Sequence, residues 1–155
     1  MAAINVDSNA PLSISLSIDG RFSQGHSWEL SVTPGGKARL SISSPGNTQV
    51  DFRVSDAQLT LLRNAILRER FFELGDTYGQ LVPDGSTRRI SVELGQHAKT
   101  VELRFLGETG AQSPEDLHEA QRPVRLWLIV RDWFEHRDAV DLRRYDRVFL
   151  KQPDP

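Results

Sequence analysis

Residues 12–18 read LSISLSI, with a leucine or isoleucine at every second position and a serine between each pair. Successive side chains of a β-strand point to opposite faces, so this strict period of two gathers the four apolar side chains on one face. The serines then occupy the other face. The stretch predicts a half-buried strand that packs on a core with one face and meets solvent with the other.

The same alternation recurs at five other places along the chain. It is found at residues 28–32, 38–42, 50–54, 90–94 and 101–105. Pro34-Gly35-Gly36 separates the first two of these runs, and Gly95-Gln96-His97 separates the last two. Short glycine-containing turns between alternating runs are typical of antiparallel hairpins. A possible further strand lies at Arg147–Leu150.

Two helical segments are predicted. Ser55 followed by Gln58 matches a capping box, and the helix that it starts is expected to continue to about Glu69. A second segment starts at residues 113–116, with a proline in its first turn. Pro123 is expected to interrupt it, so that the main helix runs from about residue 123 to 137.

The order of these elements is β-β-β-(β)-α-β-β-α, in which strands and helices do not alternate one for one. This order predicts an α+β fold: a single, mostly antiparallel sheet of about five to six strands with two helices packed on one face. With 155 residues, the chain has the length of one domain. We expect a flexible leader at 1–10, one α+β domain at 11–150 and a loose C-terminus at 151–155.

Composition excludes several classes of protein. Lys and Arg number 19 against 21 Asp and Glu, so the chain lacks the basic excess of a nucleic-acid-binding domain. It has no cysteine, which rules out disulfides, a thiolate nucleophile and cysteine-built metal sites. No apolar stretch is long enough for a membrane span. The N-terminus lacks the features of a signal peptide, which predicts a cytoplasmic protein, and a mature secreted form fits the same sequence.

Motifs for catalysis or metal binding are incomplete. His118-Glu119 starts a zinc-binding HExxH pattern, but Arg122 stands where the second histidine is required. No phosphate-binding glycine loop and no G-x-S-x-G nucleophile motif is present. We therefore predict no catalytic residue, no metal site and no cofactor. The incomplete motifs favour a protein that is not an enzyme.

The most distinctive stretch is the 75–87 loop, which follows the first helix. It carries Asp76, Tyr78 and Asp84, and connections of this length are uncommon unless they have a function or pack as a compact loop. One interpretation is a ligand or partner site, with Tyr78 as a platform or proton donor and Asp84 as an acid–base group or polar anchor. The other is structural: Tyr78 packs over the core edge, and Asp84-Gly85 forms a tight turn.

The last helix is rich in aromatic residues. Trp127 fits a core-facing stripe, whereas Trp133 and Phe134 point about 100° apart on a helix, so one of them can face a partner. The alternative interpretation is that both residues belong to the core, because a helix on a sheet face can bury a wide stripe.

The chain resembles a group of small bacterial α+β domains of unknown function. The resemblance rests on a helix ending in Phe71-Phe72-x-Leu74, then Tyr78, Asp84 and a hairpin that contains Lys99-Thr100-Val101. It covers roughly residues 12–106 and a C-terminal helix. It implies the fold, and it implies no activity, catalytic residue or cofactor.

The sequence therefore predicts a soluble bacterial protein that acts as a non-enzymatic protein-interaction or accessory domain. Its partner would be an unidentified protein or a second copy bound through a sheet edge, with neither nucleic acid nor membrane involved. The alternative is a small-molecule-binding protein or hydrolase that uses the 75–87 loop. An inhibitor or toxin-neutralising protein would share the α+β shape, but no residue marks that role.

Overall fold

The computed structural model describes residues 7, 9–19, 27–44, 48–79, 87–104 and 114–133. Asp84, Phe134 and the strand predicted at 147–150 lie outside these residues. The elements in chain order are β1 (Leu12–Asp19), β2 (Ser27–Val32), β3 (Lys37–Ser44), β4 (Thr48–Arg53), α1 (Asp56–Arg68), the 3-10 helix η1 (Phe71–Glu73), β5 (Thr77–Tyr78), β6 (Thr87–Leu94), β7 (His97–Leu103) and α2 (Pro114–Asp132).

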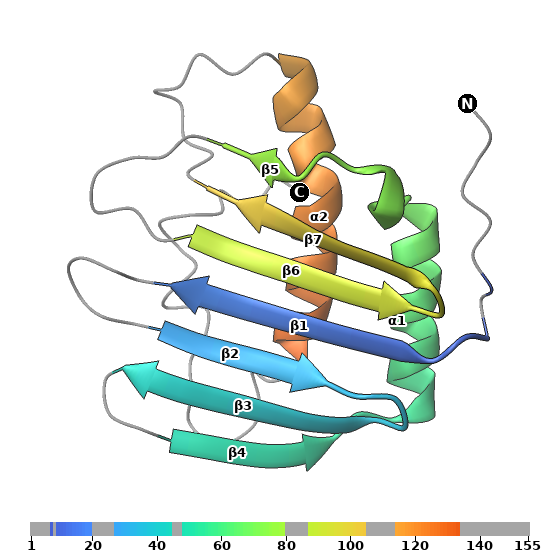
Figure 1. Ribbon diagram of the computed structural model, residues 1–155, viewed down its shortest axis with the longest axis vertical. Helices are drawn as coiled ribbons and strands as arrows, with labels where there is room; N and C mark the ends of the chain where they lie inside the picture. The colour runs from blue at the N-terminus through green and yellow to red at the C-terminus, as the bar shows by residue number, and fades with distance from the viewer. Residues whose placement is uncertain are drawn as a thin grey trace.

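Within the described residues, seven strands form one sheet in the order β4-β3-β2-β1-β6-β7-β5, and α1 and α2 lie together on one of its faces (Figure 1). The predicted α+β class is confirmed. The predicted five to six strands are too few, because the two-residue β5 lies in the stretch expected to be a loop. β5 also pairs in parallel with β7, so the sheet is mixed, whereas the other pairs are antiparallel.

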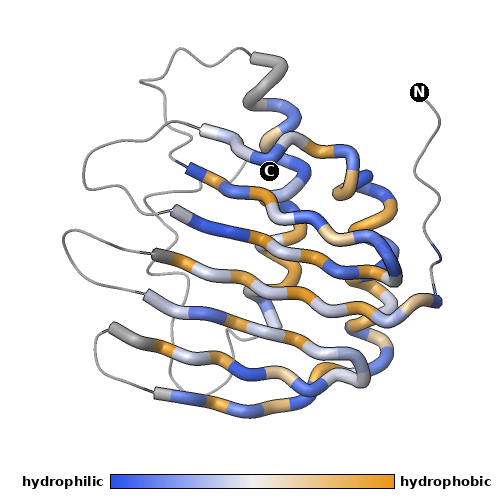
Figure 2. Tube along the Cα trace, in the orientation of Figure 1, coloured by the Kyte–Doolittle hydropathy of each residue, from blue (hydrophilic) through white to orange (hydrophobic). Residues whose placement is uncertain are grey.

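The serine-alternating strand β1 lies at the centre of the sheet. Leu16 pairs with Leu30 of β2 and Ile90 of β6, and all three side chains are buried under the helices. Ser15, one residue away, pairs with Ser31 and faces the open side. Orange and pale or blue residues alternate along the strands for the same reason (Figure 2). The period of two in the sequence thus separates a core face from a polar face across the sheet.

The two helices close the core over the apolar face. α1 contributes Leu62 and Ile66, and α2 contributes Trp127, all of them fully buried. The Trp127 ring lies 5.4 Å from the Trp28 ring, centroid to centroid, and the buried guanidinium of Arg88 lies 5.8 Å from the Trp127 ring. The largest side chain of the core is therefore in contact with both aromatic and cationic neighbours.

α1 has the predicted start. The Ser55 side chain accepts a hydrogen bond from the Gln58 N–H, and the Gln58 side chain accepts one from the Ser55 N–H, which completes the capping box. At the other end, Arg122 of α2 donates to the main-chain carbonyl of Glu69. A side chain of α2 thus satisfies one of the carbonyls that the end of α1 leaves without a helical partner.

α2 is one continuous helix, so the expected break at Pro123 is wrong. Proline in a helix interior removes a hydrogen bond and costs about 3 kcal/mol. Here Ala120, on the N-terminal side of Pro123, and Val124 and Trp127, on its C-terminal side, are all buried in the same core. Packing of both halves on the sheet outweighs the local penalty. Neither helix within the described residues is long and apolar enough to cross a membrane.

Candidate functional site

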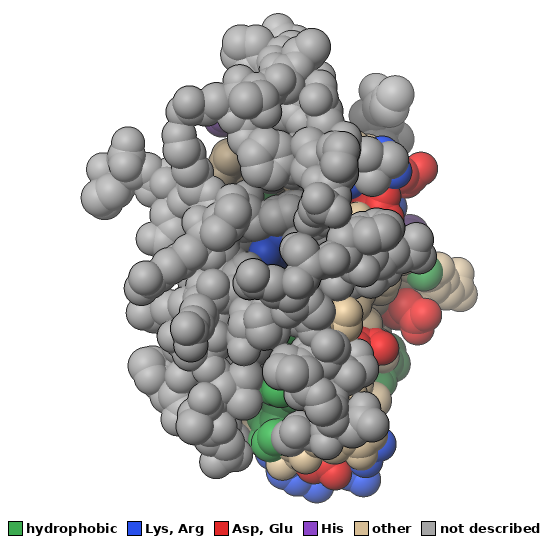
Figure 3. Space-filling model, turned by 90° about the vertical axis from the view of Figure 1, so that its left-hand side faces the viewer, with side chains coloured by type: hydrophobic (Ala, Val, Ile, Leu, Met, Phe, Trp, Pro, Cys, Tyr) green, Lys and Arg blue, Asp and Glu red, His purple; other side chains and the backbone are tan. Residues whose placement is uncertain are grey.

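The open face of the sheet is polar and charged. Serine, threonine, arginine, aspartate and glutamate alternate with the core residues on every long strand. In Figure 3, basic side chains gather at the lower end of the molecule, which is the end where Figure 1 has β4. An anionic ligand would therefore be favoured at the β4 side of the open face.

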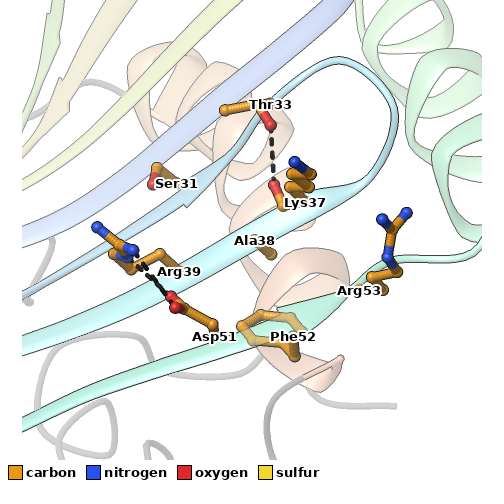
Figure 4. Close-up of a pocket in the computed structure, with 8 residues that line it drawn as sticks. All are labelled: Ser31, Thr33, Lys37, Ala38, Arg39, Asp51, Phe52 and Arg53. Carbon is orange, nitrogen blue, oxygen red and sulfur yellow. Dashed lines mark hydrogen bonds and ion pairs between the residues drawn. The ribbon is translucent and has the colours of Figure 1, made fainter.

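A hollow of about 620 Å3 lies on this part of the sheet, between the ends of β2, β3 and β4. We call it the cationic hollow (Figure 4). Its lining comprises Ser31, Thr33, Lys37, Ala38, Arg39, Asp51, Phe52 and Arg53.

The turn between β2 and β3 sets the geometry of the hollow. Gly35 and Gly36 have positive φ angles of 92° and 87°, which glycine adopts without strain. The Gly36 carbonyl accepts a hydrogen bond of 2.8 Å from the Val54 N–H, which ties the end of β4 to this turn. A Cβ on Gly36 would lie 2.4 Å from the Val54 oxygen, so the close approach requires glycine. The tie sets Lys37 directly opposite Arg53 in the β3–β4 register.

Arg39 and Asp51 form the ion pair at one side of the hollow. Arg39 Nε and Nη2 donate to the two Asp51 carboxylate oxygens at 2.7 and 3.3 Å. These hydrogen bonds lower the pKa of Asp51 and raise that of Arg39. Both side chains are exposed, so the pair fixes the direction of the Arg39 guanidinium more than it stabilises the fold.

Lys37 and Arg53 differ from that pair. Within the described part of the chain, neither side chain has a hydrogen bond or ion pair, although the two are cross-strand neighbours. Both extend from the open face in Figure 4. Like charges directly opposite each other on adjacent strands are destabilising. An anion between them would relieve this repulsion.

A second, smaller hollow of about 260 Å3 lies along the same face. Ser17, Glu29, Ser41 and Arg89 are among its lining residues. Its one cation, Arg89, pairs with Glu102 at 3.1 Å. The charges of this hollow are therefore more nearly balanced, and the cationic hollow is the stronger candidate for ligand binding.

Asp76 and Tyr78, the described residues of the site predicted in the 75–87 loop, contact different partners. The exposed Asp76 carboxylate accepts a 2.7 Å hydrogen bond from Lys99 Nζ, which lowers the Asp76 pKa. Tyr78 is buried against α2: its hydroxyl accepts from the Gly75 N–H at 2.8 Å and donates to Glu119 at 2.9 Å. These contacts join β5 to α2, and a ligand site formed with Asp84 stays a prediction.

Replacing Tyr78 with phenylalanine tests this connection. Tyr78→Phe is expected to lower the free energy of unfolding at pH 7 by about 1–3 kcal/mol, because the Gly75 N–H and the Glu119 carboxylate lose their partner. Burial raises the Tyr78 pKa to about 12, above the usual 10, so this contribution is present below pH 10 and is lost as the pH rises to 12. Urea unfolding at pH 7, 10 and 11.5 measures both effects. A Tyr78→Phe curve parallel to wild type over this range would contradict the pKa argument.

Trp133 lies at the end of α2, half-buried and packed against the core. It therefore keeps part of its surface exposed, while Phe134 lies outside the described residues.

Glu119, from the incomplete HExxH pattern, is engaged by Tyr78. Among the described residues, no group of three or more His, Asp or Glu side chains is placed to hold a metal ion.

Lys37 and Arg53 are not among the site residues that the sequence predicts. Lys37 follows the glycine turn and Arg53 ends an alternating run, so each is an ordinary strand residue when taken alone. Only the β3–β4 register shows that they are opposite each other. Pairing the two runs across their intervening turn and checking for like charges would have found them.

No family model matches the chain, and no curated protein is found as its relative.

Proposed function

We propose that this protein is a non-enzymatic protein-interaction domain that binds an anionic group of its partner in the cationic hollow. The observation that carries the proposal is the cross-strand pair of Lys37 and Arg53, which have no counter-ion within the described residues and line a hollow. Arg39, oriented by Asp51, forms a further wall. An oxyanion, either carboxylate or phosphate, is the group that ammonium and guanidinium donors recognise.

The polar groups of the hollow also favour binding over catalysis. The Thr33 hydroxyl donates to the Lys37 carbonyl at 3.2 Å, so its proton is used in the turn. The carboxylate of the hollow, Asp51, is held by Arg39. A nucleophile needs a neighbouring base to activate it, and the one carboxylate that lines the hollow is engaged in this ion pair.

The test is an NMR chemical-shift titration of the labelled protein at low salt. The probes are inorganic phosphate and a peptide of four glutamates. Replacing both Lys37 and Arg53 with glutamine is expected to weaken binding about tenfold, since two exposed ion pairs contribute roughly 0.7 kcal/mol each. Arg89→Gln on the same face is the matched control and should bind like wild type. Shifts centred elsewhere, or equal affinities in all variants, would disprove the site.

Lys37→Glu separates loss of binding from loss of fold. The glutamate would lie opposite Arg53, and an opposite-charge pair across two strands contributes about 0.2–1 kcal/mol. We expect this variant to unfold at a higher urea concentration than wild type and to bind neither probe detectably. A variant that is less stable than wild type would contradict the repulsion that motivates the proposal.

A further inference from the structure

β4 forms the outer wall of the cationic hollow and is also the last strand of the sheet (Figure 1). It pairs with β3 on one side, and no strand of the described residues pairs with its other side. A strand edge of this kind presents backbone N–H and C=O groups that another chain can bond. A ligand group bound in the hollow would therefore lie beside a strand edge that none of the described strands pairs with.

The two faces of β4 differ in what they offer an added strand. On the open face, Gln49, Asp51 and Arg53 are exposed. On the helix face, Val50 and Phe52 pack against the core but remain only partly buried. An added strand with apolar side chains on the helix face would cover Val50 and Phe52 further, and its other face would lie beside the hollow.

We propose that the partner is an extended, acidic protein segment that adds to β4 as an eighth strand of the sheet. Its apolar residues alternate with its acidic ones, so the former contact Val50 and Phe52 and the latter approach Arg53 and Lys37. The proposal rests on the proposed function, because the same two cations select the ligand.

Charge favours such a segment over a second copy of this chain. The residue of the added strand that lies opposite Arg53 must carry a free carboxylate to offset the like charges of Arg53 and Lys37. The acid that a second copy could supply from β4 is Asp51, and that carboxylate is already bound by Arg39 at 2.7 Å. An unrelated acidic segment has no such competition.

The experiment compares the capped peptide Thr-Val-Glu-Val-Glu-Val-Thr with two N-methylated forms. One form is methylated at the valines and the other at the glutamates and threonines, so each form removes the N–H groups along one edge of the peptide. An added strand bonds β4 through one edge only. We expect one form to bind about tenfold more weakly and the other to bind like the parent. Amide exchange at residues 49–53 should slow in the complex.

The outcomes separate this inference from the proposed function. If both methylated forms bind like the parent, and binding still requires Lys37 and Arg53, strand addition is wrong and the proposed function stands. If neither phosphate nor any peptide depends on Lys37 and Arg53, both proposals fail. If the protein without peptide dimerises with slowed exchange at residues 49–53, the occupant of the edge is a second copy, and the acidic segment is overturned.

Discussion

Trp127→Ala is expected to lower the free energy of unfolding by about 3–5 kcal/mol, the range for removal of a large aromatic side chain from a core. The Trp127 side chain is fully buried between the sheet and α2. Its removal takes away the ring contact with Trp28 at 5.4 Å and the ring face that lies 5.8 Å from the Arg88 guanidinium. Because a domain has a total stability of only about 5–15 kcal/mol, the variant should be near its folding limit.

Urea unfolding followed by circular dichroism measures this loss without relying on tryptophan fluorescence, which the substitution itself changes. The matched control is Leu61→Ala, which changes an apolar helix residue that is 53% exposed. The control should change the free energy of unfolding by no more than about 0.5 kcal/mol. A Trp127→Ala loss below about 1.5 kcal/mol would mean that the core between Trp28 and Arg88 closes over the missing ring.

The fold class could be predicted because its signals are local. In β1, the alternation of leucine or isoleucine with serine requires no knowledge of the partner strands to show which face is buried. The capping box at Ser55 and Gln58 is likewise contained in four consecutive residues, and the structure forms both of its hydrogen bonds. Patterns of this length survive folding because tertiary packing reinforces them.

The structure differs from the predictions where tertiary contacts determine the local conformation. β5 consists of Thr77 and Tyr78, too short to show any alternation, and becomes a strand because the carbonyls of Asp76 and Tyr78 accept from Glu102 and Arg104 N–H groups of a distant segment. Pro123 is a strong local signal for a helix break. It fails because the core buries α2 on both sides of the proline.

The candidate site is not among the sequence-based predictions, for a related reason. Lys37 and Arg53 are sixteen positions apart, and their significance lies in being opposite each other in the β3–β4 register. The sequence instead drew attention to Tyr78 and Asp76, which are conspicuous in a loop. The partners of these two residues, Glu119 and Lys99, come from other elements, so their roles also depended on the tertiary structure.

The ion pair between α1 and α2 gives the second large effect, an acid-dependent one. Arg125 Nε and Nη2 donate to the two carboxylate oxygens of the buried Glu69 at 2.9 and 2.8 Å. These bonds, assisted by Arg68, hold the Glu69 pKa below its ordinary value of 4.5. A carboxylate with a lowered folded-state pKa stabilises the protein above the unfolded-state pKa, and this contribution is lost as the pH falls through the folded-state value.

Glu69→Gln should therefore lower the free energy of unfolding at pH 7 by about 1–3 kcal/mol, because it removes the charge of a hydrogen-bonded carboxylate and leaves Arg125 with a neutral partner. Below pH 4.5 the difference from wild type should shrink, because Glu69 binds a proton in the unfolded wild-type chain first and in the folded chain only at its lower pKa. Glu73→Gln is the matched control: Glu73 pairs with Arg70 at 2.7 Å on the surface, and its loss should cost less than about 1 kcal/mol. Urea unfolding from pH 3 to 7 distinguishes the two variants. A Glu69→Gln deficit that stays constant down to pH 3 would assign the loss to packing of the side chain and not to the ion pair that joins the helices.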